Sequence, residues 1–372
     1  MELNFHTYRE IRQQPDVWKK TYEIILSRKG EIKSFLDKYL NAGYEVVFTG
    51  AGTSAYIGDA LETALSDTRL RGAKAVATTD ILVSPWFWFD ASSKVLLISF
   101  ARSGNSPESV GTVKAIEKTA GKVAHIFITC NANGELAKMK GDNILTILLP
   151  PETDDKSLAM TSSYSSMYVA CSLVANIDNI EAQRSLIDTL SDKVGKMMDK
   201  FEDGIRAIAD KGFKRAVFLG SGSLKGVAEE SRLKLQELTD GAVMCAFDSF
   251  MGFRHGPKAL VTPDALIVYL LSPVEEMQRY ELDLVRQIRD SRGAMAYVAV
   301  CRNASVLEGA GLDLCVETDL PAGFPACYGG VAYVVTGQML GFFKSLKMGL
   351  NPDTPSVSGN ISRVVEGVKL YI

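Results

Sequence analysis

Short apolar runs, each followed by a glycine-rich turn and a helical pattern, recur along this chain. One run covers residues 215–219, a Gly-Ser-Gly-Ser turn follows at 220–223, and residues 224–238 have the spacing of a helix that Gly241 can end. Free backbone N–H groups and the helix dipole point toward such a turn. A strand–turn–helix unit of this kind therefore favours an anion, and phosphate is its usual occupant.

A similar unit begins 170 residues earlier, and other strands repeat with it. The matching segments are 45–54 with 215–224, 96–98 with 266–268, and 129–131 with 300–302, the last at an offset of 171. An offset maintained over three strands indicates an internal duplication in which each copy alternates strands with helices. The sequence therefore predicts an α/β fold of two domains with parallel sheets, each binding ligand at the carboxyl ends of its strands.

The segments around the two copies set the expected domain boundaries. Residues 8–40 hold two helical patterns separated by residues 28–30, and a Gly- and Pro-containing stretch at 349–355 breaks the last helix. The expected divisions are an N-terminal helical extension at 1–44, a first domain at 45–195, a second domain at 196–350, and an extended C-terminal tail at 351–372.

Charge and composition exclude several classes of function. The chain of 372 residues has 41 basic and 44 acidic side chains, a net charge of −3, which gives no electrostatic basis for binding nucleic acid or a membrane surface. Its six cysteines lie far apart without zinc-ligand spacing, so we expect reduced thiols in a cytoplasmic protein and no metal site. A charged N-terminus and the lack of a long apolar run predict neither a signal peptide nor a membrane span.

The first copy carries hydroxyl side chains where a phosphate would sit. Ser106 is a good N-cap, Pro107 a good first helical residue, and Ser103 precedes them in the same loop. Residues 161–163 add a further cluster of hydroxyls, while the corresponding loop of the second copy, residues 271–276, is acidic. We interpret the first copy as the phosphate-binding one; the alternative is that the serines merely cap a helix.

The second copy carries candidates for acid–base chemistry. Glu230, Lys234 and Glu237 form one stripe of the helix at 224–238, a pattern that fits either catalytic groups or a solvated face with ordinary ion pairs. His255, one of only three histidines, precedes a Gly-Pro turn. Histidine side chains can pass protons near neutral pH, although a loop histidine is often only a surface residue.

A dinucleotide-binding enzyme is the main rival interpretation. Gly50 and Gly52 follow a strand and partly fit the glycine fingerprint, which expects an acidic residue about 20 positions further on. Asp80 lies 28 residues beyond Gly52, and the hydroxyl-rich loop suits a monophosphate better.

Taken together, these segments resemble the sugar isomerase (SIS) domain family. The resemblance rests on the doubled units, on residues 103–106, and on residues 233–239 with 255–257. Within the family the chain looks most like the galactosamine-6-phosphate deaminase/isomerase group, also called tagatose-6-phosphate ketose/aldose isomerase, at residues 96–110, 159–163, 252–261 and 351–368. The family implies two tandem SIS domains, each a five-stranded parallel sheet between helices in a flavodoxin-like arrangement.

The isomerase half of glucosamine-6-phosphate synthase is a more distant likeness that implies roles for individual residues. By resemblance, Glu237 shuttles a proton with Lys234 beside it, and His255 opens the sugar ring. The residues implied in substrate or phosphate binding are Gly52, Thr53, Ser54, Arg102, Ser103, Asn105, Ser106, Ser162 and Arg363. In that family the histidine comes from a partner subunit, which implies a homodimer or higher homo-oligomer with shared active sites.

Two departures from the synthase separate this chain from an aminating enzyme. It starts directly at the sugar-phosphate module, with no glutamine-hydrolysing part to deliver ammonia. Its tail has Arg363 and no lysine between Lys347 and Lys369, and a guanidinium stays protonated and forms no imine.

The resemblance implies a deaminating isomerisation of an amino-sugar phosphate, D-galactosamine 6-phosphate to D-tagatose 6-phosphate plus ammonia. It calls for no metal or organic cofactor and no partner beyond the sugar phosphate and other copies of the chain. Three alternatives remain open: an isomerase of a hexose 6-phosphate without nitrogen, a glucosamine-6-phosphate deaminase, and a non-catalytic sugar-phosphate sensor.

Overall fold

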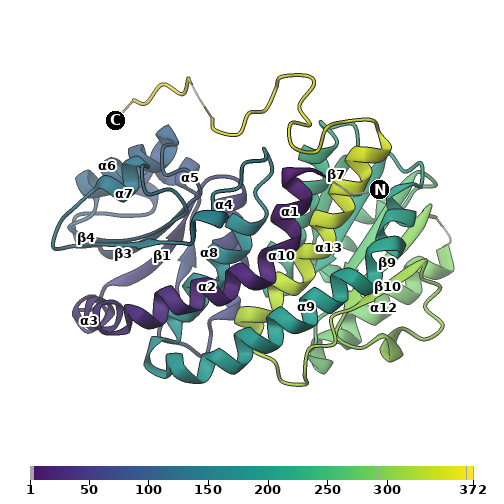
Figure 1. Ribbon diagram of the computed structural model, residues 1–372, viewed down its shortest axis with the longest axis horizontal. Helices are drawn as coiled ribbons and strands as arrows, with labels where there is room; N and C mark the ends of the chain where they lie inside the picture. The colour runs from purple at the N-terminus through teal and green to yellow at the C-terminus, as the bar shows by residue number, and fades with distance from the viewer. Residues whose placement is uncertain (1–3, 292, 366, 372) are drawn as a thin grey trace. The chain divides into compact units, whose positions relative to one another are not determined.

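The computed structural model describes residues 4–291, 293–365 and 367–371, and the chain divides into two compact units. We call them the first-sheet unit and the second-sheet unit. The first-sheet unit comprises Asp16–Asp155, Met160–Ile187 and Ser362–Ile372, and the second-sheet unit Met1–Pro15, Lys156–Ala159 and Asp188–Ile361. Figure 1 labels the helices and strands of both.

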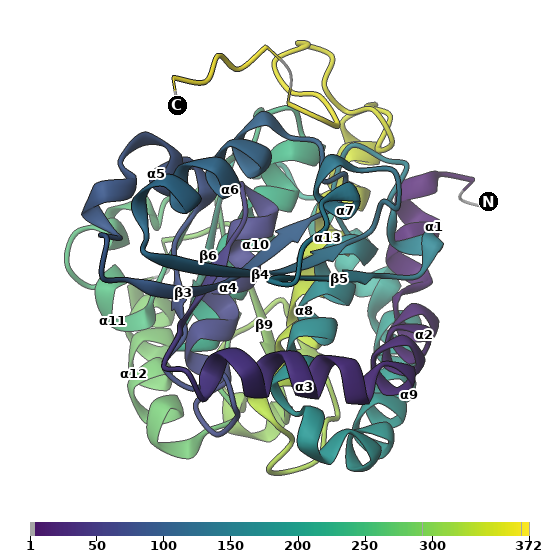
Figure 2. The same cartoon turned by 90° about the vertical axis from the view of Figure 1, so that its left-hand side faces the viewer.

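The first-sheet unit is built on a five-stranded parallel sheet in the order β2-β1-β3-β4-β5. Its strands are β1 (Glu45–Thr49), β2 (Lys74–Ala75), β3 (Lys94–Ala101), β4 (Lys122–Thr129) and β5 (Ile144–Leu148). One face carries α4 (Thr53–Ala64) and α8 (Ser162–Ala175), and the other carries α5 (Thr78–Val83) and α6 (Pro107–Thr119) (Figure 2). Because both faces are covered, the central strands read as continuous apolar runs.

The second-sheet unit repeats this plan in the order β10-β9-β8-β6-β7. Its strands are β6 (Arg215–Gly220), β7 (Met244–Asp248), β8 (Ala265–Leu270), β9 (Ala296–Cys301) and β10 (Leu314–Glu317). On one face α10 (Ser223–Leu238) packs along α13 (Ala326–Lys347), as Figure 1 shows. On the other face α11 (Phe250–Phe253) and α12 (Glu275–Ser291) complete an apolar core. The predicted fold class, two parallel five-stranded sheets flanked by helices, is confirmed.

The duplication is visible in the backbone of the two glycine turns. Gly52 has φ 54° and ψ −129°, and Gly222 has φ 56° and ψ −129°, a region that only glycine enters readily. A Cβ on Gly50 would come within 2.4 Å of the Ser54 backbone, and one on Gly220 within 2.1 Å of the Leu224 backbone. Both copies therefore need glycine at the same two places to turn from strand into helix.

The N-terminal helices differ in detail from the two predicted. The chain forms α1 (His6–Arg12), α2 (Gln14–Ser27) and α3 (Lys29–Leu40), so a break falls at Gln13 as well as at Arg28, and Gly30 lies inside α3. Pro15 explains the first break, because proline lacks a backbone N–H and its ring clashes with the carbonyl of the preceding turn. The remaining elements are α7 (Glu135–Lys138) and α9 (Ile180–Ala209) with the short 3₁₀ helices at 85–87, 151–153, 177–179, 257–260 and 304–307.

The two ends of the chain belong to opposite units. The Thr7 hydroxyl and backbone N–H both donate to the Asp353 carboxylate, at 2.9 and 2.8 Å, and the buried Glu10 accepts from the backbone N–H groups of Lys156 and Ser157. Residues 1–15 therefore go with the second-sheet unit, whereas the tail beyond residue 361 goes with the first. The expected boundary at 195/196 lies within α9.

One helix has the length and composition of a membrane span. Among the described residues only α13 passes that test, and 89% of its apolar window is buried inside the fold. Its packing along α10 accounts for the apolar composition as that of a core helix.

A buried carboxyl group in the second-sheet unit makes stability depend on pH. Glu281 of α12 is fully buried, and burial raises its pKa to about 7. Hydrogen bonds from the Ser272 backbone and the Ser221 hydroxyl lower this pKa, but by less than burial raises it. Because the folded pKa lies above the unfolded value of 4.5, the fold binds more protons than the unfolded chain between these pH values. Folding stability therefore falls as the pH rises from 4.5 to 7.

We predict that Glu281→Gln stabilises the fold at pH 8 by on the order of 2 kcal/mol and has little effect at pH 4.5, because glutamine keeps the acceptor and removes the charge. Urea unfolding at the two pH values measures the difference. An equal effect at both values contradicts it.

Candidate functional site

The first-sheet unit has a cavity of about 130 Å³ at the carboxyl ends of β1 and β3. Its walls come from the loops after these two strands, from Met160, and from the C-terminal tail at residues 363–365. This is the edge at which a parallel sheet of this kind is expected to bind ligand. The chemistry of the cavity follows from the side chains that these loops deliver.

Four serine side chains line the cavity. They are Ser54 at the start of α4 and Ser103, Ser106 and Ser109 around the start of α6. Ser106 is the N-cap of α6, as predicted: its hydroxyl oxygen accepts from the Ser109 backbone at 3.3 Å, and its hydroxyl donates to Ser109 Oγ at 2.7 Å. Hydroxyls at two helix N-termini form a neutral, donor-rich wall suited to an oxyanion.

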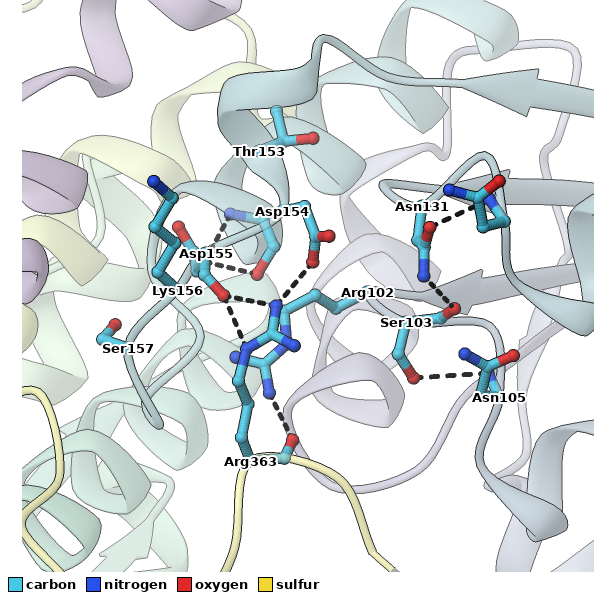
Figure 3. Close-up of polar contacts among 12 residues, drawn as sticks. Arg102, Ser103, Asn105, Asn131, Thr153, Asp154, Asp155, Lys156, Ser157 and Arg363 are labelled. Atoms are coloured by element: carbon cyan, nitrogen blue, oxygen red, sulfur yellow. Dashed lines mark hydrogen bonds and ion pairs between the residues drawn. The ribbon is translucent and has the colours of Figure 1, made fainter.

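Two arginines, Arg102 and Arg363, also line this cavity and add positive charge to it. Figure 3 shows the polar contacts that they make. Arg102 is 6% exposed, and its guanidinium donates to the backbone carbonyl of Arg363. Burial lowers the pKa of Arg102, the Asp155 carboxylate opposes that shift, and the neighbouring Arg363 reinforces it. A guanidinium still stays charged, so the cavity holds cations beside its hydroxyls.

Arg363 is held in the cavity wall by the loop that follows β5. Its guanidinium donates to the Asp154 carboxylate at 2.6 Å and to the Asp155 backbone carbonyl at 2.6 and 2.9 Å (Figure 3). The Asp155 carboxylate in turn accepts three hydrogen bonds from the start of α8. The donors are the Thr161 backbone N–H at 2.8 Å, the Ser163 backbone N–H at 2.9 Å and the Ser163 hydroxyl at 2.6 Å. The tail is therefore tied to a buried polar network.

The structure brings together part of the predicted phosphate-binding set. Ser54, Arg102, Ser103, Ser106 and Arg363 line the cavity. The lining does not include Gly52, Thr53, Asn105 and Ser162. The Ser162 hydroxyl instead donates to Asp155, and the Asn105 side chain accepts from the Glu135 backbone, so both support loops around the site.

Several residues at this cavity were not predicted. Ser109 and Glu108 line it, and Asp154 and Asp155 hold Arg363. Ser109 was detectable, since it is three residues after an N-cap serine on the same helix. The two aspartates had no local signal, because their partner lies more than 200 positions away in the chain.

In the second-sheet unit, the predicted stripe on α10 is a buried ion-pair cluster. Lys234 Nζ lies 2.7 Å from Glu237 and 3.3 Å from Glu230. Lys234 and Glu230 are fully buried, while the Glu237 side chain is 22% exposed. The solvated-face alternative is therefore wrong for two of the three residues, and only Glu237 keeps access to solvent.

The charge state of Lys234 limits what it can do. Burial lowers its pKa, but the carboxylates of Glu230 and Glu237 outweigh burial and leave the pKa above its ordinary value. A lysine that stays protonated is neither a base nor an amine nucleophile. Lys234 is suited to orienting Glu237 and to stabilising negative charge near it.

His255 lies on the turn between α11 and the 3₁₀ helix at 257–260. Its side chain is exposed, and its backbone N–H donates to the Gly252 carbonyl at 3.0 Å. The fold presents this ring to solvent on a short turn.

Known proteins share this architecture over nearly the whole chain. The SIS domain model matches residues 38–177. The D-galactosamine-6-phosphate deaminase AgaS of Escherichia coli is 36% identical over 98% of this chain and 95% of its own length, and that of Shewanella sp. (strain ANA-3) is 34% identical over 99% and 92%. The crystal structure of tagatose-6-phosphate ketose/aldose isomerase from Escherichia coli aligns with a TM-score of 0.89 at 34% identity, over 99% of this chain and 97% of that one.

We predict that Ser103→Ala and Ser106→Ala each weaken phosphate binding at least several-fold, because each removes one charge-assisted hydrogen bond to the anion. Only Ser106→Ala should also lower the free energy of unfolding, by about 1 kcal/mol, because only Ser106 caps a helix. Calorimetric titration with inorganic phosphate and urea unfolding separate the two effects. Unchanged phosphate affinity in both variants contradicts the assignment of the cavity.

Proposed function

The chain belongs to the SIS-domain family of the D-galactosamine-6-phosphate deaminases AgaS, and from this we propose that it converts D-galactosamine 6-phosphate to D-tagatose 6-phosphate and ammonia. The observation that carries the proposal is the ion-pair cluster on α10, in which one partly exposed carboxylate, Glu237, is held by a buried ammonium whose pKa is raised above its ordinary value. A phosphate sensor needs an anion site but has no use for such a group.

The first-sheet cavity supports a phosphate-bearing substrate. Four hydroxyls and two guanidinium groups surround a space of about 130 Å³. Such contacts are made equally in the ground state and the transition state, so they contribute to affinity more than to turnover. The phosphate then serves as a handle that holds the reacting carbons in place.

Glu237 is assigned the proton transfer between C2 and C1. His255 protonates the ring oxygen, the pyranose opens, and the C1 aldehyde is released. Glu237 takes the C2 proton to give an enolamine and returns a proton to C1, leaving an imine at C2. Water adds to the imine carbon and ammonia leaves, which gives the ketose. A placed general base of this type contributes about 10²- to 10⁴-fold.

The charge on Lys234 fits this sequence of steps. Its ammonium lies 2.7 Å from Glu237 and holds in place the carboxylate that must accept the C2 proton. The substrate already carries nitrogen at C2, so an imine arises from its own amine and no lysine imine is required. Arg363, which replaces a lysine by resemblance, is assigned to the phosphate end of the substrate.

Deamination is favoured over simple isomerisation by the names of the relatives. Those at 36% and 34% identity are named deaminases of D-galactosamine 6-phosphate, and the related structure is named a tagatose-6-phosphate ketose/aldose isomerase. One reaction reconciles the two names, since an amino aldose that loses ammonia after isomerisation yields a ketose. All six cysteines lie in the described part of the chain and are free, and we assign the reaction to the cytoplasm, a compartment that keeps thiols reduced.

A homodimer with shared active sites is the second part of the proposal. The exposure of His255 on a short turn leaves its ring available to a neighbouring chain. In this arrangement Glu237 of one subunit and the histidine of the other serve the same substrate.

We predict that Glu237→Gln lowers kcat for ammonia release at least about 10²-fold with little change in KM, because glutamine keeps the size and removes the base. Glu230→Gln is the matched control: it changes the other carboxylate bonded to Lys234 and should cost stability more than turnover. Steady-state kinetics on galactosamine 6-phosphate and glucosamine 6-phosphate provide the test. Normal turnover in folded Glu237→Gln removes Glu237 from the chemistry.

We also predict that mixing inactive Glu237→Gln subunits with inactive His255→Ala subunits restores activity, because a mixed dimer contains one site with both groups intact. Subunit exchange is verified first with differently tagged chains. Exchange without recovered activity places both groups in the site of a single chain.

A further inference from the structure

The second-sheet unit has a small pocket of its own at the carboxyl ends of its strands. It has a volume of about 40 Å³ and lies between the start of α10, the loops after β8, β9 and β10, and the first turns of α13. Its lining shares no residue with the first-sheet cavity. Nothing in the proposed reaction uses it.

The polar groups at this pocket are donors, and two of them lack partners. Arg302, just beyond β9, is half-buried and has no ion pair or side-chain hydrogen bond within the described part of the chain. The Thr318 hydroxyl, just beyond β10, is fully buried and likewise has no hydrogen-bond partner among the described residues. A buried hydroxyl without a partner is unfavourable unless a ligand or water satisfies it.

The start of α10 adds further donors on the same side. Gly222 occupies the N-cap position and offers no capping side chain, and Ser223, the first helical residue, lines the pocket. The Leu224 and Lys225 N–H groups already donate to the carbonyls of Ser221 and Gly222, so the Ser223 hydroxyl and the dipole of this 16-residue helix are the groups that attract negative charge. Together with Arg302 they favour an anion.

Apart from Tyr333, whose hydroxyl donates to the Leu271 carbonyl at 3.0 Å, the rest of the wall is apolar and limits the size of that anion. Leu224, Leu320 and Phe324 line the pocket, with Pro273 and Gly329. A volume of about 40 Å³ has room for roughly three water-sized groups, so only a molecule of a few non-hydrogen atoms fits. A phosphate would place oxygens against apolar side chains, whereas a carboxylate with a short alkyl tail matches a wall with donors on one side and hydrocarbon on the other.

From these groups we propose that the second-sheet unit binds a small aliphatic carboxylate, with its carboxylate on Arg302 and Thr318 and its alkyl tail on Leu320 and Phe324. The site is separate from the reacting groups of the same unit. Ser223 and Glu237 stand at opposite ends of α10, 14 residues apart, or roughly 21 Å at 1.5 Å per residue. The proposal does not depend on the function proposed above.

Three acids lie near this lining. Asp319, between Thr318 and Leu320, is exposed to solvent, and Glu317 accepts from the Ala304 backbone at 2.7 Å. The third, Glu281, is fully buried. Glu281 accepts from the backbone of Ser272, which precedes Pro273, at 2.8 Å. Its pKa is raised to about 7 by burial, so at pH 6 it is largely neutral and opposes an incoming anion least. Binding is therefore measured at pH 6.

The test is calorimetric titration of the full-length chain with propionate, and with hexanoate and inorganic phosphate as comparison ligands. We expect one propionate per chain with a dissociation constant of about 1 mM, weaker binding of hexanoate, and at least about tenfold weaker propionate binding in Arg302→Gln. Thr318→Val, which exchanges only the hydroxyl for a methyl group, should weaken it several-fold.

Two control variants distinguish this pocket from the first-sheet cavity as the place where propionate binds. Gly329→Ala places a methyl group in the pocket 4.0 Å from Leu320 Cδ1, an ordinary contact, and alanine favours the helix, so this variant should lose propionate without losing stability. Ser103→Ala alters the first-sheet cavity and should leave propionate binding intact. Absence of propionate binding, binding that survives in Arg302→Gln and Gly329→Ala, or phosphate binding tighter than propionate at this site would each overturn the proposal.

Discussion

One buried positive charge constrains the second-sheet unit. Lys234 lies inside α10 between two carboxylates, and removing it would leave Glu230 buried without its counter-charge, at a cost of about 3–5 kcal/mol. The neighbouring helix encloses this cluster closely. A Cβ on Gly337 would come within 2.6 Å of the Ser231 side chain, and one on Gly341 within 3.0 Å of the Lys234 carbonyl, so glycine is required where α13 crosses α10. The position of Glu237 therefore follows from core packing, and its exposed edge remains available for chemistry.

The two copies show how one backbone device supports different chemistry. Gly52 and Gly222 have nearly the same φ and ψ, and each opens a helix at the carboxyl edge of a parallel sheet. Serines and two arginines line the cavity of the first-sheet unit, whereas proline, leucine, phenylalanine and one arginine line the pocket of the second-sheet unit. A helix N-terminus favours an anion in both copies, and we expect the side chains around it to determine whether that anion is a fully oxygenated group or one with an apolar tail.

The sequence was sufficient for features that depend on local or repeated signals. Strand runs, glycine turns and the 170-residue offset predicted both sheets, and the Ser-Pro pair predicted the start of α6. Features that depend on distant partners were not predictable. Arg363 meets Asp154 and Asp155 only in the folded chain, and the helical spacing of Glu230, Lys234 and Glu237 could not reveal that two of them are fully buried. The assignment of residues 1–15 to the second-sheet unit likewise depends on contacts with Asp353 and residues 156–157.

The role of Glu237 as a carboxylate that moves a proton from C2 to C1 is tested most directly by turnover of galactosamine 6-phosphate in deuterated water. Ammonia and ketose are quantified together, and deuterium at C1 of the ketose is measured by NMR. The mechanism releases one ammonia for each ketose, so equal amounts of the two are expected. A proton resting on a carboxylate exchanges with solvent, so the ketose should carry deuterium at C1. Ketose without deuterium at C1, or ketose formed without ammonia, would contradict it.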